Sequence, residues 1–141
     1  MIWVMDASVA VKWFLRDEHH PHAQKVLEEV VRNPALFAVP ELFLFEVYAV
    51  LKRRHPRGDE AFIDVILPIL EGGIYRQPMT KKLAERAGPF VGMGLTGYDA
   101  CYAALAEDLG ALWITFDEKA HNLIAHRHVS HNLMEGLPEG W

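Results

Sequence analysis

Four acidic residues are the side chains of this chain that are best suited to do chemistry. Glu46 lies in the middle of an apolar run, Leu42 to Leu51, whose composition and length predict a helix. Its neighbours three and four positions away on that helix would all be apolar, so none of them could neutralise its charge. Because an ionised carboxylate is very costly to bury without a partner, a basic side chain, a proton or a metal ion from outside the helix should meet it.

The other three acids lie where strands end or helices begin. Asp6 directly follows a predicted strand at residues 2–5, and Asp117 lies just beyond a predicted strand at 112–115. Asp99 opens the helix that precedes this second strand. Because the ligands of parallel α/β sheets gather beyond the carboxyl ends of the strands, all four acids could converge on one crevice.

Each of these three acids also has an ordinary structural role open to it. Asp6 and Asp117 could each cap the helix that follows it. The segment from Thr96 to Asp99 resembles a capping box. For any one of the three taken alone, capping is the commoner role. No such role is open to Glu46, so one cation bound by all four acids is the simplest shared explanation.

The types of donor predict which metal ion would bind. Carboxylates without histidine or cysteine among them favour the hard divalent ions Mg²⁺ or Mn²⁺ over zinc or copper. Such ions lower the pKa of a bound water and stabilise attacking and leaving oxygens, so a site of this kind could cleave a phosphodiester. Ser8 and Thr115 could orient a water or a carboxylate there, or could simply be turn residues.

The composition of the chain is that of a globular protein. With 141 residues, 51% of them apolar and 23% charged, it is predicted to form one domain, residues 1–141. No apolar run approaches the roughly 20 residues that a membrane span needs, and the N-terminus shows no basic leader or cleavage site, so we expect a cytoplasmic protein. The net charge of -5 does not indicate a nonspecific nucleic-acid coat. Cys101 is the only cysteine, which excludes an internal disulfide and favours a small core residue.

Short apolar runs alternate with helical patterns along the chain, which predicts an α/β fold with a parallel sheet covered by helices on both faces. The predicted strands are residues 2–5, 36–39 and 112–115, with a weaker one at 74–76. The predicted helices are 22–31, a helix that begins at Pro40 and contains Glu46, 60–70, 81–87, 98–109 and 118–126. Gly88 and Pro89 are expected to end the helix at 81–87.

Four segments of the chain carry a further pattern: Val4–Val9, Pro40–Leu51, Leu95–Tyr102 and Trp113–Asp117. In this order they resemble the PIN-domain ribonucleases, and in particular the toxin subunits of VapBC-type toxin–antitoxin pairs. Each segment is weak by itself, whereas together they are specific and span most of the chain. A modest departure is Ala49, which stands where many relatives have a small polar asparagine.

The resemblance implies a compact three-layer α/β/α domain around a parallel sheet and a Mg²⁺- or Mn²⁺-dependent endoribonuclease. We expect Asp6 and Asp99 to be the principal metal ligands and Lys12 or Arg53 to meet substrate phosphates. Toxins of this family usually form homodimers and are held inactive by a cognate antitoxin, so the resemblance implies both partners here. RNA as the substrate, rather than DNA, also rests on it. The residues that it assigns to the site are Asp6, Glu46, Asp99, Asp117, Thr115 and Ser8.

Two other functions remain open on the sequence. Gly92, Gly94 and Gly97 match the GxGxxG pattern of a dinucleotide-binding loop, which makes a nucleotide-binding module or an oxidoreductase the main alternative. That pattern should follow a strand, whereas the segment before it is predicted to be helical. A catalytically idle PIN-like interaction domain would lack one of the acids, and none is missing here.

The eight histidines are enriched near residues 19–22 and 121–131, which suggests a second possible metal site. His121 and His126 are five residues apart, so they do not share a helix face as an i, i+4 pair of ligands would. We therefore expect the histidines to occupy surface loops and helix ends.

Overall fold

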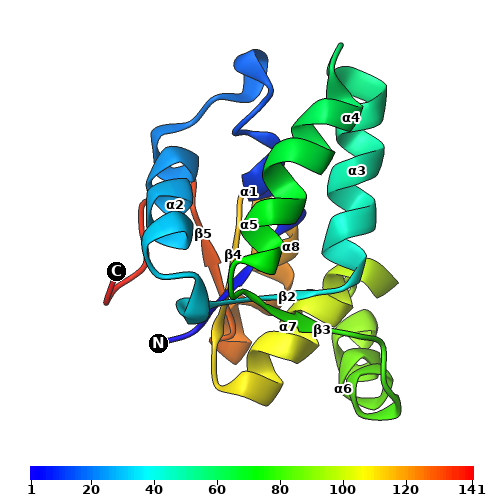
Figure 1. Ribbon diagram of the computed structural model, residues 1–141. Coiled ribbons are helices and arrows are strands. Elements are labelled where there is room, and N and C mark those ends of the chain that lie inside the picture. Colours follow the sequence, from blue (N-terminus) through cyan, green and yellow to red (C-terminus); the bar gives the residue numbers. More distant parts are fainter.

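A five-stranded parallel sheet forms the centre of the protein, as the computed structural model of residues 1–141 shows (Figure 1). Neighbouring strands pair in the order β3-β2-β1-β4-β5. The strands are β1 (Trp3–Met5), β2 (Phe37–Pro40), β3 (Tyr75–Gln77), β4 (Leu112–Thr115) and β5 (Ser130–Asn132).

Helices cover both faces of this sheet, so the predicted three-layer α/β/α fold is confirmed. The helices are α1 (Ala7–Val11), α2 (Pro21–Arg32), α3 (Leu42–Arg54), α4 (Gly58–Ala61), α5 (Leu67–Glu71), α6 (Lys81–Gly92), α7 (Gly97–Leu109) and α8 (Glu118–Ile124). Figure 1 shows α2, α3 and α5 on one side of the sheet and α6 and α7 on the other. A π-helical turn, Phe62–Ile66, joins α4 to α5, and short 3₁₀ turns occupy Arg16–Glu18, Pro34–Leu36 and Ala125–Arg127. None of the helices is both long and apolar enough to cross a membrane.

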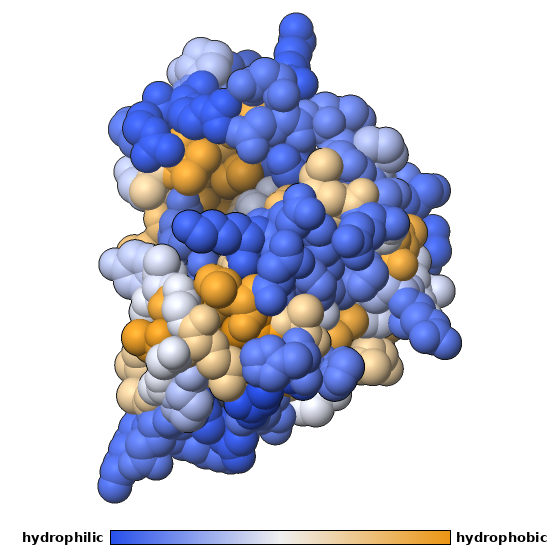
Figure 2. Space-filling view, turned by 180° about the vertical axis from the view of Figure 1, so that it is seen from behind, coloured by the Kyte–Doolittle hydropathy of each residue, from blue (hydrophilic) through white to orange (hydrophobic).

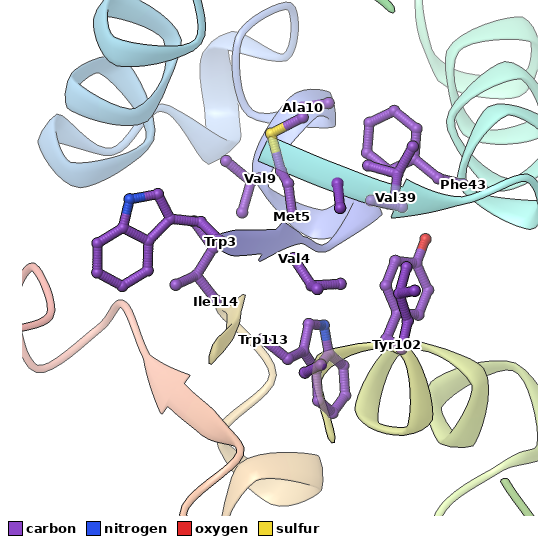
Figure 3. Close-up of a cluster of buried hydrophobic side chains, with 14 of the residues drawn as sticks. Trp3, Val4, Met5, Val9, Ala10, Val39, Phe43, Tyr102, Trp113 and Ile114 are labelled. Atoms are coloured by element: carbon purple, nitrogen blue, oxygen red, sulfur yellow. The ribbon is translucent and has the colours of Figure 1, made fainter. Parts of the chain in front are cut away.

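The core lies on both faces of the central strands. All residues of β1 and β2 are buried, which explains why these strands are continuous apolar runs in the sequence. Figure 3 shows Val4, Met5, Tyr102 and Trp113 packed around β1. Each large side chain so buried stabilises the fold by about 1.5–3 kcal/mol, so the core also fixes where the ends of the strands lie.

The strands agree with the sequence within one residue, and β5 is the exception because the sequence predicts no strand there. Its residues are polar, and it lies at the edge of the sheet beside β4. The helix containing Glu46 begins at Leu42, so its predicted start at Pro40 is wrong. Pro40 instead pairs with Gln77 of β3, and the backbone N–H of Glu41 donates to the Gln77 carbonyl at 2.8 Å. The chain therefore stays in the sheet through Pro40, and the helix begins two residues later than predicted.

Helix α6 continues through Gly88 and Pro89 to Gly92, so the predicted end of this helix is also wrong. A proline inside a helix leaves the carbonyl four residues earlier without a partner. That residue is Glu85, and both Glu85 and Pro89 are exposed, so water can satisfy the freed carbonyl. The opposite face of the helix is buried and holds it in place.

The close approach of α4 to the end of α3 depends on Gly58. A Cβ atom added at Gly58 would lie 2.6 Å from the carbonyl carbon of Leu51, whereas one added at Gly88 would meet nothing within 4 Å. We expect Gly58→Ala to lower the free energy of unfolding by about 1–3 kcal/mol. The matched control Gly88→Ala should raise it by up to about 1 kcal/mol, because alanine is the better helix former. Urea denaturation of both variants measures the difference, and equal stabilities would contradict the close contact.

Candidate active site

The candidate site lies where the order of the strands reverses. β1 is the first strand in the chain, and it lies between β2 and β4 in the sheet. Ligands of doubly wound α/β folds bind at this switch point, beyond the carboxyl ends of the strands. Asp6 follows β1 directly, and Thr115 and Asp117 stand at the end of β4. The backbone N–H of Asp6 donates to the carbonyl of Ile114 at 3.1 Å, which extends the pairing of the two strands up to the first acid.

Asp6 is the buried member of the site. Its Oδ2 accepts hydrogen bonds from the backbone N–H of Ser8 and from Thr115 Oγ1, both at 3.1 Å, and its Oδ1 accepts one from Trp113 Nε1 at 3.2 Å. Burial raises the pKa of the Asp6 carboxyl, and these hydrogen bonds oppose that rise. The bond from Ser8 also makes Asp6 the N-cap of α1. Asp6 therefore has the capping role that the sequence left open and also belongs to the candidate site.

Glu46 projects from the middle of α3 and is half-buried. Its Oε1 accepts a hydrogen bond of 2.8 Å from the Tyr102 hydroxyl, and no basic side chain forms an ion pair with it. Burial, followed by the charges of Asp6 and Asp99, raises the pKa of Glu46 to about 7. The partner that meets Glu46 from outside the helix is therefore a hydroxyl, which is none of the three partners that the sequence predicted and does not neutralise the charge. The surrounding run is less buried than its composition indicates, since Phe45 is 72% exposed.

Asp99 and Asp117 lie at the starts of two helices. The Thr96 hydroxyl caps α7 by accepting the N–H of Asp99 at 3.1 Å, which leaves the Asp99 carboxyl half-buried beside the other acids. Burial, together with the charges of Asp6 and Asp117, raises the pKa of Asp99 to about 6. Asp117 is exposed and caps α8 through an Oδ1 that accepts the N–H of Ala120 at 2.9 Å. The predicted cap is thus confirmed for Asp117, whereas of the predicted capping box only the half in which Thr96 accepts the Asp99 N–H forms. Neither arrangement removes its acid from the site.

Two hydroxyl side chains connect these acids. Thr115 Oγ1 donates to Asp6 and accepts the backbone N–H of Asp117 at 3.0 Å, so it fixes the first acid relative to the last. Ser8 contributes its backbone N–H to Asp6, while its Oγ accepts the N–H of Phe116 at 3.2 Å. Thr115 therefore orients a carboxylate, which is one of the two roles that the sequence left open for it.

Tyr102 and Trp113 are the site residues that the sequence reasoning missed. Their rings stack in the core at 5.7 Å with an interplanar angle of 15°. Figure 3 shows their polar atoms pointing the same way, the hydroxyl toward Glu46 and the indole N–H toward Asp6 according to the hydrogen bonds. A tyrosine and a tryptophan in buried elements each need a partner for their polar atom, and this need is the signal that could have identified them.

The four acids fit a divalent cation in chemistry and in charge. Their carboxylate oxygens are the ligands that hard cations prefer, and they lie close enough together to raise the pKa values of Glu46 and Asp99. They are not arranged as a finished coordination shell, because no three side chains of His, Cys, Asp or Glu are placed so that they could hold one metal ion. The structure therefore brings the four carboxylates near one another but does not arrange them as a complete coordination site for an ion.

The competing motifs occupy other positions. The GxGxxG segment joins α6 to α7 and follows a helix, so it lacks the strand that a dinucleotide-binding loop requires. His121 Nδ1 lies 2.8 Å from Ser130 Oγ, and His131 Nε2 lies 2.8 Å from the carbonyl of Gly136. These histidines have local hydrogen-bond partners, and they form no group that could hold a metal ion.

Fold and site together define a doubly wound parallel α/β domain with a carboxylate cluster at its switch point. The model of the PIN domain family matches residues 3–125, and the chain belongs to that family. Its members generally use a divalent metal ion, and the toxins among them are endoribonucleases. No curated protein matches the sequence significantly.

Solved structures of toxins and toxin–antitoxin complexes have the same fold. FitAB bound to an IR36 DNA fragment has a TM-score of 0.73 and 14% identity, with 99% of this chain and 100% of that chain covered. VapC20 of Mycobacterium tuberculosis, a toxin that cleaves the sarcin–ricin loop, has a TM-score of 0.64 and 16% identity over 85% of this chain and 93% of that one. VapBC2 of Rickettsia felis, bound to a DNA fragment from its promoter, has a TM-score of 0.65 and 15% identity over 94% and 98%.

Proposed function

We propose that the chain is a metal-dependent endoribonuclease and the toxin component of a VapBC-type toxin–antitoxin pair. The observation that carries this proposal is the convergence of Asp6, Glu46, Asp99 and Asp117 at the β1/β4 switch point of a PIN domain. A nuclease of this kind needs no nucleophilic side chain, and Cys101, the only cysteine, is buried in the core.

The same four acids would hold the ion, which we propose to be Mg²⁺ with Mn²⁺ as a substitute. When bound, such an ion lowers the pKa of a water and stabilises the oxygens that attack and leave at phosphorus. Asp6 is the fixed ligand because three donors orient its carboxylate. Thr115 positions Asp6 against Asp117, and Ser8 positions the turn at Phe116 that leads to Asp117.

The test is cleavage of a single-stranded RNA by the purified chain with Mg²⁺, with Mn²⁺ and with EDTA. We expect cleavage with either ion and none with the chelator. A DNA of the same sequence run beside it measures the preference for RNA, which contacts to the 2′-hydroxyl would have to supply. Cleavage that survives EDTA would contradict a metal-dependent mechanism.

We also propose that a cognate antitoxin binds the chain in the cytoplasm and that the chain forms a homodimer. The similarity of the fold to the FitAB and VapBC2 complexes supports an antitoxin partner.

An apolar groove of about 530 Å³, lined in part by Phe45, Met79 and Tyr98, supports a further protein contact, since such residues are rarely exposed together on a monomer. Figure 2 shows apolar patches that interrupt the hydrophilic surface of the back face. Light scattering of Phe45→Asp against the unmodified chain tests the homodimer.

A further inference from the structure

Lys12 and His20 both lie against the ring of Phe116, the residue between Thr115 and Asp117, and the His20 ring is tilted by 58° to it. Lys12 Nζ lies 4.9 Å from the centroid of the Phe116 ring, and the His20 ring lies 5.0 Å from the same centroid. The three residues come from the end of α1, the turn after β4 and the residue before α2, and we call them the rim stack. The sequence predicted that Lys12 or Arg53 meets substrate phosphates, and the site described above gives no role to the side chains of Phe116 and His20.

The rim stack is joined to the acids by one short chain of hydrogen bonds. Phe116 stands between Thr115 and Asp117, and its backbone N–H donates to Ser8 Oγ. The backbone N–H of Ser8 in turn donates to Asp6. A group bound at the rim stack would therefore be a near neighbour of a group bound at the acids.

Lys12 supplies a positive charge whose own partner is already engaged elsewhere. Its side chain is only 15% exposed, and its Nζ lies 3.5 Å from Glu18, which is long for an ion pair. Glu18 also pairs with Arg54, and Arg54 pairs in turn with Asp17 at 2.8 Å. The ammonium of Lys12 is held in place by the Phe116 ring and retains hydrogens to donate to a ligand.

His20 presents one defined donor next to the same aromatic ring. Its Nδ1 accepts the backbone N–H of His22 at 3.0 Å and caps α2, so the proton of the neutral ring resides on Nε2. No hydrogen bond within the protein uses Nε2. Burial lowers the pKa of His20, and the charges of His22, Lys12 and His19 lower it further, which favours the neutral ring with its single Nε2 donor.

We propose that Lys12 Nζ and His20 Nε2 form a phosphate subsite, which binds the backbone phosphodiester beside the one held at the acids. This inference rests on the proposed function, because it assigns the subsite to the RNA substrate. The acids repel a nucleic acid, so the strand needs cationic contacts close by to hold it across them. The amino end of α2, a helix of 12 residues that begins next to His20, also favours an anion here.

The subsite is tested by the binding of a fluorescently labelled 12-nucleotide single-stranded RNA to the Asp99→Asn chain in EDTA. This background removes cleavage from the measurement. Lys12→Met keeps the apolar stem and removes the charge, and Lys12→Arg restores a charge. His20→Asn keeps the cap, because asparagine is a good N-cap residue, and removes the Nε2 donor. Lys81→Met is the matched control for net charge, since Lys81 is exposed on α6 and pairs only with Glu85.

We expect Lys12→Met to raise the Kd about tenfold, as for the loss of one hydrogen bond from a charged group, and Lys12→Arg to recover most of this. The slope of log Kd against log salt should fall by about one in Lys12→Met, because one phosphate contact is lost. His20→Asn should raise the Kd about threefold to tenfold with the slope unchanged, since a neutral donor releases no counterion. Lys81→Met should change neither quantity.

The outcomes separate the subsite from the proposed function. If the parent chain binds no RNA, or if Lys12→Met and His20→Asn bind with the same Kd and salt slope as the parent, the subsite is wrong. It is also wrong if Lys12→Met weakens binding only by lowering the melting temperature and Lys12→Arg recovers nothing, because the rim stack would then merely hold residues 12–20 in place. Cleavage by the unmodified chain decides the nuclease function separately. A chain that binds RNA through Lys12 without cutting it would retain the subsite and lose that function.

Discussion

Asp99→Asn is expected to abolish RNA cleavage while the fold remains intact. The Asp99 carboxyl is half-buried beside Asp6 and Asp117, and burial followed by these two charges raises its pKa to about 6, so a bound cation would favour its ionised form. The cap of α7 uses the backbone N–H of Asp99 and the Thr96 hydroxyl, which the substitution leaves in place. We expect at least about a 100-fold loss of cleavage, because changes that only reorient a metal ligand already cost 10–100-fold. Initial rates with Mg²⁺, together with a melting curve, measure both quantities.

The control for this substitution is Asp108→Asn, in the same helix. Asp108 pairs with Lys82 at 2.8 Å and with Arg86 at 3.2 Å, away from the other acids. Its loss should change stability slightly and cleavage not at all. Asp6→Asn is a less informative variant, since an asparagine amide could not accept all three hydrogen bonds that reach Asp6, and the fold would suffer with the activity. Full activity of Asp99→Asn would remove Asp99 from the mechanism.

Glu46→Gln is expected to stabilise the metal-free protein at neutral and higher pH and to lower its activity. The pKa of Glu46 is raised from 4.5 to about 7 in the folded chain. Between these pH values the folded chain keeps a proton that the unfolded chain has released, so the free energy of unfolding falls as pH rises. The raised pKa of Asp99 acts in the same direction between 3.8 and about 6. Glutamine removes the contribution of Glu46 to this pH dependence. After allowance for the partial exposure of Glu46, the free energy of unfolding of the variant should exceed that of the unmodified chain by about 1–2 kcal/mol at pH 8. This difference should close toward pH 4.

Urea denaturation at pH 4, 6 and 8 measures this gap, and Glu85→Gln, an exposed substitution on α6, provides the baseline. Repeating the series with Mn²⁺ separates two roles. If Glu46 faces the ion, the variant should gain less stability from Mn²⁺ than the unmodified chain does, because binding stabilises the folded state according to its affinity. A variant with the same pH profile, the same gain from Mn²⁺ and the same cleavage rate would show that Glu46 is neither a strained acid nor a part of the site.

The sequence predicts the central strands well because burial on both faces forces them to be continuous apolar runs. It predicts β5 poorly, since an edge strand pairs through its backbone and Ser130–Asn132 shows no apolar pattern. The same limit explains α6, where the buried face outweighs the breaking effect of Pro89. Local pattern therefore identifies elements whose burial leaves an apolar pattern in the sequence, and it misses a strand or a helix end that depends on contacts with the rest of the fold.

The acids of the site could be found from the sequence because each has an unusual position, whereas their supports could not. The hydrogen bond from Tyr102 to Glu46 joins residues 56 apart in the chain, and the one from Trp113 to Asp6 joins residues 107 apart. No spacing rule connects residues at such separations. The partial exposure of Glu46 was likewise hidden, because the aromatic residues beside it indicate burial when the sequence is read alone.

The four acids differ in how firmly they are held. We call Asp6 and Glu46, which accept hydrogen bonds from the stacked rings of Trp113 and Tyr102, the floor of the site, and we call Asp99 and Asp117 its edge. Asp6 and Glu46 receive hydrogen bonds from rings that are themselves packed in the core, so moving either acid means repacking the interior. Asp99 and Asp117 stand at helix ends nearer to solvent. A change of rotamer breaks no hydrogen bond of the Asp99 carboxylate, and at Asp117 it breaks only the cap of α8. Damage in a mutational scan should therefore be of two kinds. Changes that remove a hydrogen-bond acceptor of the floor, which Glu46→Gln does not, should reduce the amount of folded protein, and changes at the edge should leave a well-folded protein that no longer works.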